Sequence, residues 1–232
     1  MSDIVMASSR GFDVAKDLIK NHPSSDRLHI YAKSAGKTED LAALVPDFIK
    51  EVGVQNTQGL HVYFLSGLCD ITCMEVDREY SAYEFYEEVV FMEPWQETVD
   101  RVTKSINSAA ESMFQINVTP IFCTIPPMSF HTWNHHRLQK GNTSFLLHHN
   151  HYEDMQYSLI TAIQRINNNI VQINSSNGVT TPHLATTVMT NMGPNRRPRV
   201  FYNRFRDGVH AAKDLKKNGL KNCIKPCAKT ET

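Results

Sequence analysis

An acid and an imidazole lie three residues apart near the end of the chain, as Asp207 and His210 in the segment FRDGVH. A carboxylate can hold a histidine ring in one tautomer, and that histidine can then take a proton from a hydroxyl group. Two hydroxyls, Ser8 and Ser9, stand near the beginning of the chain in the segment ASSRG. If folding brings these segments together, they supply the nucleophile, the base and the orienting acid of acyl transfer.

The same residues also have a plainer interpretation. Asp207 has the residue type of a helix N-cap, and the two serines suit a strand-to-helix turn. The elements that would position these residues therefore have to decide between catalysis and local structure.

Apolar segments typical of strands alternate with amphipathic segments typical of helices along the whole chain. Each predicted strand is followed by a predicted helix, which predicts parallel strands joined by right-handed crossovers. We therefore predict an α/β fold, a three-layer doubly wound sandwich around a five-stranded parallel sheet, of flavodoxin-like type. The predicted strands are residues 3–8, 28–36, 60–67, 116–127 and 182–189, and the predicted helices are 12–21, 38–53, 93–113, 152–173 and 210–218.

Length and composition fit one globular domain, which we expect over residues 1–218, followed by a basic C-terminal tail over 219–232. No apolar run is long enough for a membrane span, and the N-terminus lacks the pattern of a secretory signal. Five cysteines, an odd number, then favour free thiols in a reducing compartment. The sequence therefore predicts a cytoplasmic protein.

Ligand sites in doubly wound sheets lie at the carboxyl ends of the strands. The ASSRG segment follows the first predicted strand, Gly36 ends the second, and the segment SGLCD follows the third. The segment RDGVH follows the fifth. We expect all four segments to face one crevice, where they offer a hydroxyl, backbone amides, a polar loop and an acid–imidazole pair.

These four segments together resemble the SGNH (GDSL-type) hydrolase superfamily, and the resemblance covers nearly the whole chain. Two positions depart from the family pattern. Its Gly-Asp-Ser reads Ala7-Ser8-Ser9 here, and its Gly-x-Asn-Asp reads Gly67-Leu68-Cys69-Asp70. Cys69 thus replaces the asparagine that donates an N–H to the oxyanion, and a thiol is a weak donor.

The resemblance implies a serine esterase or lipase-like hydrolase without a cofactor or metal, acting on an acyl or acetyl ester of a small molecule, glycan or lipid. The resemblance assigns Ser9 as the nucleophile, with Ser8 as its rival, His210 as the base and Asp207 as its orienter. It also places the oxyanion donors at Ser9, Gly36 and the Cys69 position, with Gly67 and Asp70 completing the third block. The alternative is a catalytically weak or inactive module of the same fold, encoded by a mobile element or a virus, that binds protein or nucleic acid.

The alternative rests on charge, because residues 1–120 carry 10 Lys and Arg against 19 Asp and Glu, and residues 121–232 carry 14 against 5. A basic surface near the C-terminal loops would attract phosphate or nucleic acid. The plainer interpretation is a solvated face with a disordered tail. The arginines proposed for such binding are Arg196, Arg197, Arg199 and Arg204.

Three further clusters admit both a functional and a structural interpretation. Cys69 and Cys73, with Cys223 and Cys227, have the residue types of a zinc site, but their spacing favours small apolar fillers and a pair of tail thiols. His131 and His135 could bind a metal from one helix face, but we interpret residues 131–151 as a long loop that overhangs the crevice. In that loop Trp133 and Phe145 would contact substrate. The aromatic residues could form an acyl-binding wall, and helix-packing core is the favoured interpretation: Tyr80, Tyr83, Phe85, Tyr86, Phe91 and Trp95.

Overall fold

The computed structural model describes residues 3–8, 27–77, 85–91, 93–190 and 199–201. Its centre is a four-stranded sheet in the order β2-β1-β3-β6, in which every pair of neighbouring strands is parallel. The four strands are β1 (Asp3–Ser8), β2 (Leu28–Lys33), β3 (Leu60–Leu65) and β6 (Val118–Phe122). They confirm the first four predicted strands, each of which begins within two residues of its predicted start.

The fifth predicted strand is wrong. Residues 182–189 contain a short 3₁₀ helix, η3 (Leu184–Thr187), and the beginning of β7 (Met189–Thr190), which pairs antiparallel with β8 (Arg199–Val200) outside the main sheet. The parallel sheet has four strands instead of five.

Buried asparagine side chains occupy the edge of the sheet where the fifth strand was expected. The side-chain amide of Asn174 accepts from the N–H of Phe122 at 3.1 Å and donates to its carbonyl at 2.7 Å. Asn167 makes the same pair of bonds to Ile125, at 2.7 and 2.9 Å. A further strand would need these backbone groups, so a helix with two amides closes the edge in its place.

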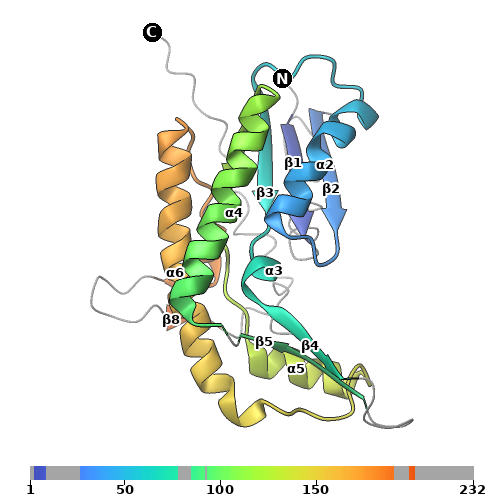
Figure 1. Ribbon diagram of the computed structural model, residues 1–232, viewed down its shortest axis with the longest axis vertical. Coiled ribbons are helices and arrows are strands. Elements are labelled where there is room, and N and C mark those ends of the chain that lie inside the picture. Colours follow the sequence, from blue (N-terminus) through green and yellow to red (C-terminus); the bar gives the residue numbers. More distant parts are fainter. Residues whose placement is uncertain (1–2, 9–26, 78–84, 92, 191–198, 202–232) are drawn as a thin grey trace.

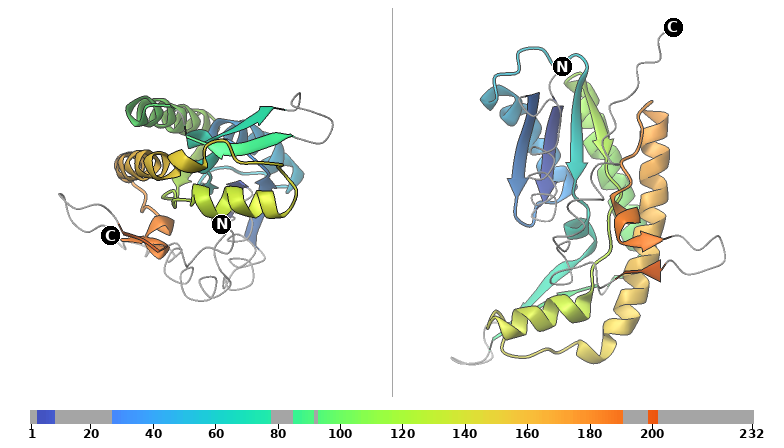
Figure 2. Two further views of the ribbon diagram at one scale, coloured as in Figure 1. Left: turned by 90° about the horizontal axis from the view of Figure 1, so that it is seen from below. Right: turned by 180° about the vertical axis from the view of Figure 1, so that it is seen from behind.

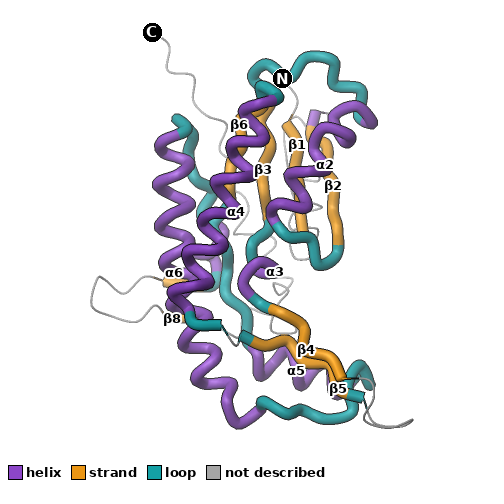
Figure 3. The backbone as a smooth tube through the Cα atoms, in the orientation of Figure 1, coloured by secondary structure: helices purple, strands orange, loops and turns teal. Residues whose placement is uncertain are grey.

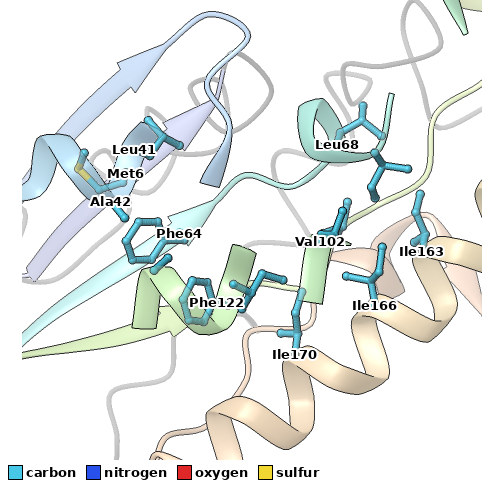
Figure 4. Packing of buried hydrophobic residues seen from close by; sticks show 14 of the residues in the cluster. Met6, Leu41, Ala42, Phe64, Leu68, Val102, Phe122, Ile163, Ile166 and Ile170 are labelled. Atoms are coloured by element: carbon cyan, nitrogen blue, oxygen red, sulfur yellow. The ribbon is translucent and has the colours of Figure 1, made fainter. Parts of the chain in front are cut away.

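Three long helices pack together beside the sheet (Figures 1 and 3). They are α2 (Thr38–Glu51), α4 (Trp95–Gln115) and α6 (Tyr152–Ser176), and they confirm three of the predicted helices. Their apolar faces meet one face of the sheet, where Met6, Phe64 and Phe122 lie in the main core (Figure 4). The rings of Phe64 and Phe122 stack with their centroids 5.1 Å apart.

The opposite face of the sheet is buried as well. Val5 and Ala7 are fully buried and belong to a second apolar cluster with Leu65 and Cys123. A strand covered on both faces has a continuous run of apolar residues in its sequence, and β1 has such a run in IVMA. The helices predicted at 12–21 and 210–218 and the tail at 219–232 lie outside the described residues, so the three-layer arrangement and the domain boundary stay predictions.

An arm extends beyond the carboxyl ends of the sheet strands (Figures 1 and 2). We define this arm as the antiparallel hairpin of β4 (Cys73–Asp77) and β5 (Tyr86–Val90) together with helix α5 (Phe130–Gln139). Asn134 of α5 bonds both backbone groups of Val89, at 3.0 and 2.9 Å. The prediction of one long loop over 131–151 is therefore wrong for its first part, and the sequence analysis did not predict the hairpin.

Where the chain is described, none of its helices has the length and apolar character that crossing a membrane would require.

Candidate active site

The carboxyl ends of β1, β2 and β3 meet at one edge of the sheet, as predicted for a site of this fold. The register pairs Ser8 with Lys33 and Ala7 with Leu65, so the segments after these three strands start side by side. The short helix α3 (Leu68–Ile71) lies directly beyond β3, between the sheet and the arm (Figure 1).

Ser8 is the described hydroxyl at the end of β1. It is buried, with 2% of its surface exposed, and its hydroxyl donates to the carbonyl of Leu65 at 3.3 Å. This bond directs the hydroxyl toward the neighbouring strand and makes Ser8 a poor nucleophile. Ser9, Asp207 and His210 lie outside the described residues.

Gly36 closes the turn after β2 and is buried. Its N–H donates to the carbonyl of Lys33 at 3.2 Å, within the turn. A Cβ atom at this position would lie 3.2 Å from both that carbonyl oxygen and the Leu41 side chain, so the space fits a glycine closely. To stabilise an oxyanion, the Gly36 amide would have to give up or share its bond to Lys33.

Gly67 begins the third block, and its geometry strongly favours glycine. Its φ is +108°, a conformation that L side chains rarely adopt. A Cβ atom would come within 2.3 Å of Cδ1 of Ile125, which follows β6. The glycine therefore lets the loop after β3 pass directly over the loop after β6.

Asp70 ends the third block and is bound to the beginning of α2. Its carboxylate accepts from the Thr38 N–H at 3.1 and 3.2 Å and from the Thr38 hydroxyl at 2.9 Å. Because the Thr38 hydroxyl donates its proton to Asp70, the Ser66 hydroxyl, 2.9 Å away, donates to Thr38. Asp70 thereby provides an acceptor for a backbone N–H at the start of α2, where a negative charge is favourable. The same bonds connect the loop after β2 to the loop after β3.

Asp70 is buried, with 5% of its surface exposed. Burial raises the pKa of Asp70, and this effect outweighs the Thr38 hydrogen bonds and the charges of Lys37 and Arg101, which lower it. Arg101 of α4 also donates to the Asp70 backbone carbonyl at 2.8 Å, while its other nitrogens bind Glu93. The block is thus fastened to α4 as well as to α2.

The residues that the sequence analysis missed here are Thr38, Ser66 and Arg101. Thr38 was recognised only as the start of a helix, and its link to Asp70 spans 32 positions. A basic residue facing a backbone carbonyl leaves no pattern in a sequence, so Arg101 had no signal.

The structure describes only part of the cysteine cluster, and it places both histidines of the histidine cluster on α5. Cys69 and Cys73 form no disulfide bond with each other, and among the residues that the structure covers no three His, Cys, Asp or Glu side chains come together as a metal site. His131 and His135 stack on α5 with ring centroids 4.3 Å apart, and burial lowers the pKa of His135, with a further lowering by His131 and His149.

The aromatic residues divide between core and surface. Tyr86 and Phe91 are buried and Trp95 packs against the core, which confirms the core interpretation for these three, whereas Phe85 is 36% exposed. Phe145 stacks on Tyr86 in the arm. Tyr80, Tyr83, Arg196, Arg197 and Arg204 lie outside the described residues, as do Cys223 and Cys227, and Arg199 is described only as part of β8.

No known family pattern matches the chain, and no curated protein matches it. Several solved structures are similar to the chain. A GDSL-like lipase from Bacteroides thetaiotaomicron superposes with a TM-score of 0.57 at 12% identity, over 95% of this chain and 85% of that one. The acetyl xylan esterase AlAXEase gives 0.51 at 14% identity, over 95% and 96%.

The fold is that of the SGNH (GDSL-type) hydrolases. The OSK domain of Drosophila Oskar is similar to this chain as well, with a TM-score of 0.51 at 12% identity over 94% of this chain and 84% of that one. Sequence identities this low make the chain a divergent example of the SGNH fold.

Proposed function

We propose that the protein is a serine esterase that cleaves an acyl or acetyl ester of a small molecule, glycan or lipid, without a cofactor. In this proposal Ser9 attacks the ester carbonyl as His210 takes its proton, and Asp207 orients the imidazole and stabilises its charged form. Backbone amides at Ser9 and Gly36 receive the oxyanion, the Gly36 amide sharing its bond to the Lys33 carbonyl, with Cys69 in the third donor position. Water then releases the acyl group.

One observation supports this proposal above the others. The turn at Gly36 and the block Gly67–Asp70 are held against each other at the carboxyl edge of the sheet by the Asp70–Thr38 hydrogen bonds. The turn and the block both lie beside the end of β1, and the last residue of β1, Ser8, directly precedes Ser9. Preorganised loops of this kind are what oxyanion stabilisation requires.

A fluorophosphonate probe tests the nucleophile directly. We expect the probe to label the intact chain and Ser8→Ala but not Ser9→Ala, because the Ser8 hydroxyl is buried against Leu65. Mass spectrometry of the labelled peptide would identify the modified serine. Absence of labelling in the folded wild-type chain would refute the esterase proposal.

The residue at position 69 offers a second test. Replacing the thiol by an amide in Cys69→Asn adds a strong donor, and we expect the rate of p-nitrophenyl acetate hydrolysis to rise by about 10²–10³. Cys69→Ser, of nearly the same size as cysteine and without an amide, is the matched control. An equal rise in both variants would contradict an oxyanion role for this position.

The weak donor at Cys69 favours one rival, a module of the same fold that binds nucleic acid through its basic C-terminal region. Retention on a nucleic-acid column should then fall steeply with salt and be lost in the triple variant Arg196→Ala, Arg197→Ala, Arg199→Ala. Retention of this kind without fluorophosphonate labelling would replace the esterase proposal.

A further inference from the structure

The arm contains a strand whose outer edge is open. β4 pairs with β5 on one side, and none of the described strands pairs with its other side. β5 in contrast is covered on both sides, because Asn134 of α5 and Thr143 bind the edge that faces away from β4 (Figure 2).

The bonds of β5 reveal which groups of β4 point outward. Val89 binds Asn134 through both of its backbone groups, and Glu87 gives its N–H to Thr143 Oγ1 at 3.1 Å. These two residues therefore direct their backbone away from β4. In an antiparallel ladder, residues directly opposite each other share this orientation. Met74, opposite Val89, and Val76, opposite Glu87, thus direct their N–H and C=O groups to the open edge.

The side chains along this edge combine apolar surface with negative charge. Met74 and Val76 are 44% and 45% exposed, whereas β2, the outer strand of the main sheet, has no exposed large apolar side chain among those described. Glu75 lies between them on the other face of the hairpin, with 43% of its side chain exposed. The strands β4 and β5 together carry four carboxylates and no basic residue. Glu88 is buried and Glu87 binds Arg137 of α5, so Glu75 and Asp77 supply the charge of β4 itself, and Glu75 also lies 2.9 Å from the ring of His148.

We propose that the open edge of β4 docks an extended segment of a partner protein as an added strand. The partner's backbone would pair with the outward groups of Met74 and Val76 and place apolar side chains opposite these two residues. A lysine or arginine between those apolar side chains would face Glu75. Main-chain bonds supply affinity in this mode of recognition, and alternating side chains supply specificity.

Charge argues against a second copy of the chain as the occupant. Antiparallel self-pairing that places Met74 opposite Val76 also places Glu75 opposite Glu75, and centring the pair on Val76 places Glu75 opposite Asp77. Like charges directly opposite each other destabilise a sheet. The register centred on Met74 avoids this repulsion but pairs Val76 with Thr72, beyond the end of the strand.

The test uses the full chain and two labelled peptides, Val-Lys-Val-Lys-Val and Val-Glu-Val-Glu-Val. We expect fluorescence anisotropy to show binding of the lysine peptide and at least about tenfold weaker binding of the glutamate peptide. Bound peptide should also slow hydrogen exchange at the amides of Met74 and Val76.

Val76→Pro removes an outward N–H without touching the β4–β5 ladder, and edge strands tolerate proline. We expect about tenfold loss of lysine-peptide binding in this variant, with its melting temperature close to that of the wild type. Val76→Thr, which keeps the N–H, should bind within about twofold of the wild type.

Three results would overturn the proposal. They are failure of the lysine peptide to bind, equal binding by a folded Val76→Pro chain, and equal binding of the two peptides. A doubled mass in sedimentation that Val76→Pro reverses would assign the edge to a second copy instead.

Discussion

At the scale of single residues, the candidate site depends on positions where the backbone itself is constrained. Gly67 combines a positive φ with a location where a Cβ atom would collide with the Ile125 side chain. Gly53, at the end of α2, has a φ of +73°, but a Cβ atom there would meet nothing within 4 Å. The two glycines separate the cost of conformation from the cost of collision.

We expect Gly67→Ala to destabilise the fold by several kcal/mol, because a strained φ costs about 1–2 kcal/mol and overpacking adds about 1–3 kcal/mol. Gly53→Ala should show only the first cost. Urea denaturation of both variants measures the difference. Equal losses would mean that the loop at Gly67 moves away from Ile125 at little cost.

The sequence identified these blocks by resemblance but did not reveal how they hold together. Gly67 and Asp70 were recognised as parts of a family block, whereas the cap that Asp70 provides for α2 depends on Thr38, far away in the chain. Hydrogen bonds between distant loops have no sequence period, so only the fold displays them.

At the scale of elements, buried asparagines act as substitutes for strands. Asn134, Asn167 and Asn174 each bind the N–H and the C=O of one strand-end or strand residue, as a neighbouring strand would. Two of them lie on α6 among its apolar positions, where the sequence indicated only an ordinary buried helix face.

Asn174→Ala should leave the N–H and C=O of Phe122 without partners, at about 1–3 kcal/mol for each buried group. Asn169→Ala, on the same helix, removes a single bond to the Thr103 hydroxyl and should cost about 0.5–1.5 kcal/mol. Thermal or urea denaturation of the two variants measures both values. A smaller loss for Asn174→Ala than for its control would contradict the edge-closing role.

The elements that the sequence predicted well are those with a strong period. β1, β3, α4 and α6 bury continuous or periodic apolar sets, whereas β4 buries none of its residues and α5 buries only Phe130 and Asn134. β4 and α5 therefore carry too little hydrophobic pattern to be recognised, and the buried residues of β5 include the charged Glu88. The fifth strand was wrongly predicted because residues 182–189 are apolar enough for a strand. The segment meets the sheet edge at Pro182, whose carbonyl accepts from the Thr124 N–H at 3.0 Å, and then turns into η3.

At the scale of the whole molecule, a buried carboxylate joins the arm to the helical layer. Glu88 of β5 is fully buried and accepts from the N–H groups of Leu147 and His148, at 3.0 and 3.2 Å, and from the hydroxyl of Tyr152 at the start of α6. Charge buried in this way is tolerated only while its donors remain.

Tyr152→Phe removes one donor from Glu88, and we expect the amides of β5 to exchange hydrogen faster while those of β1 keep their protection. Tyr157→Phe, at a half-exposed position of the same helix, should leave both regions unchanged. Hydrogen exchange followed by mass spectrometry resolves the two regions. Equal acceleration in the arm and the sheet would mean that the molecule opens as one unit.

The parallel direction of the sheet strands, and hence the edge where the candidate site lies, could be predicted from the sequence, because alternating strands and helices allow few arrangements. The meeting of the serine at the start of the chain with the histidine near its end stays a prediction, since Ser9 and His210 lie outside the described residues.

The paired hydrogen bonds of the buried asparagines also make the fold sensitive to a chemical change of these side chains. An amide both gives and takes a hydrogen bond, whereas the carboxylate left by its spontaneous hydrolysis can only take one. Conversion of Asn174 to aspartate, a change of one heavy atom, would turn the 2.7 Å contact with the Phe122 carbonyl into a repulsion between two oxygens away from water. Hydrolysis of this one amide would therefore open the edge of the sheet that it closes.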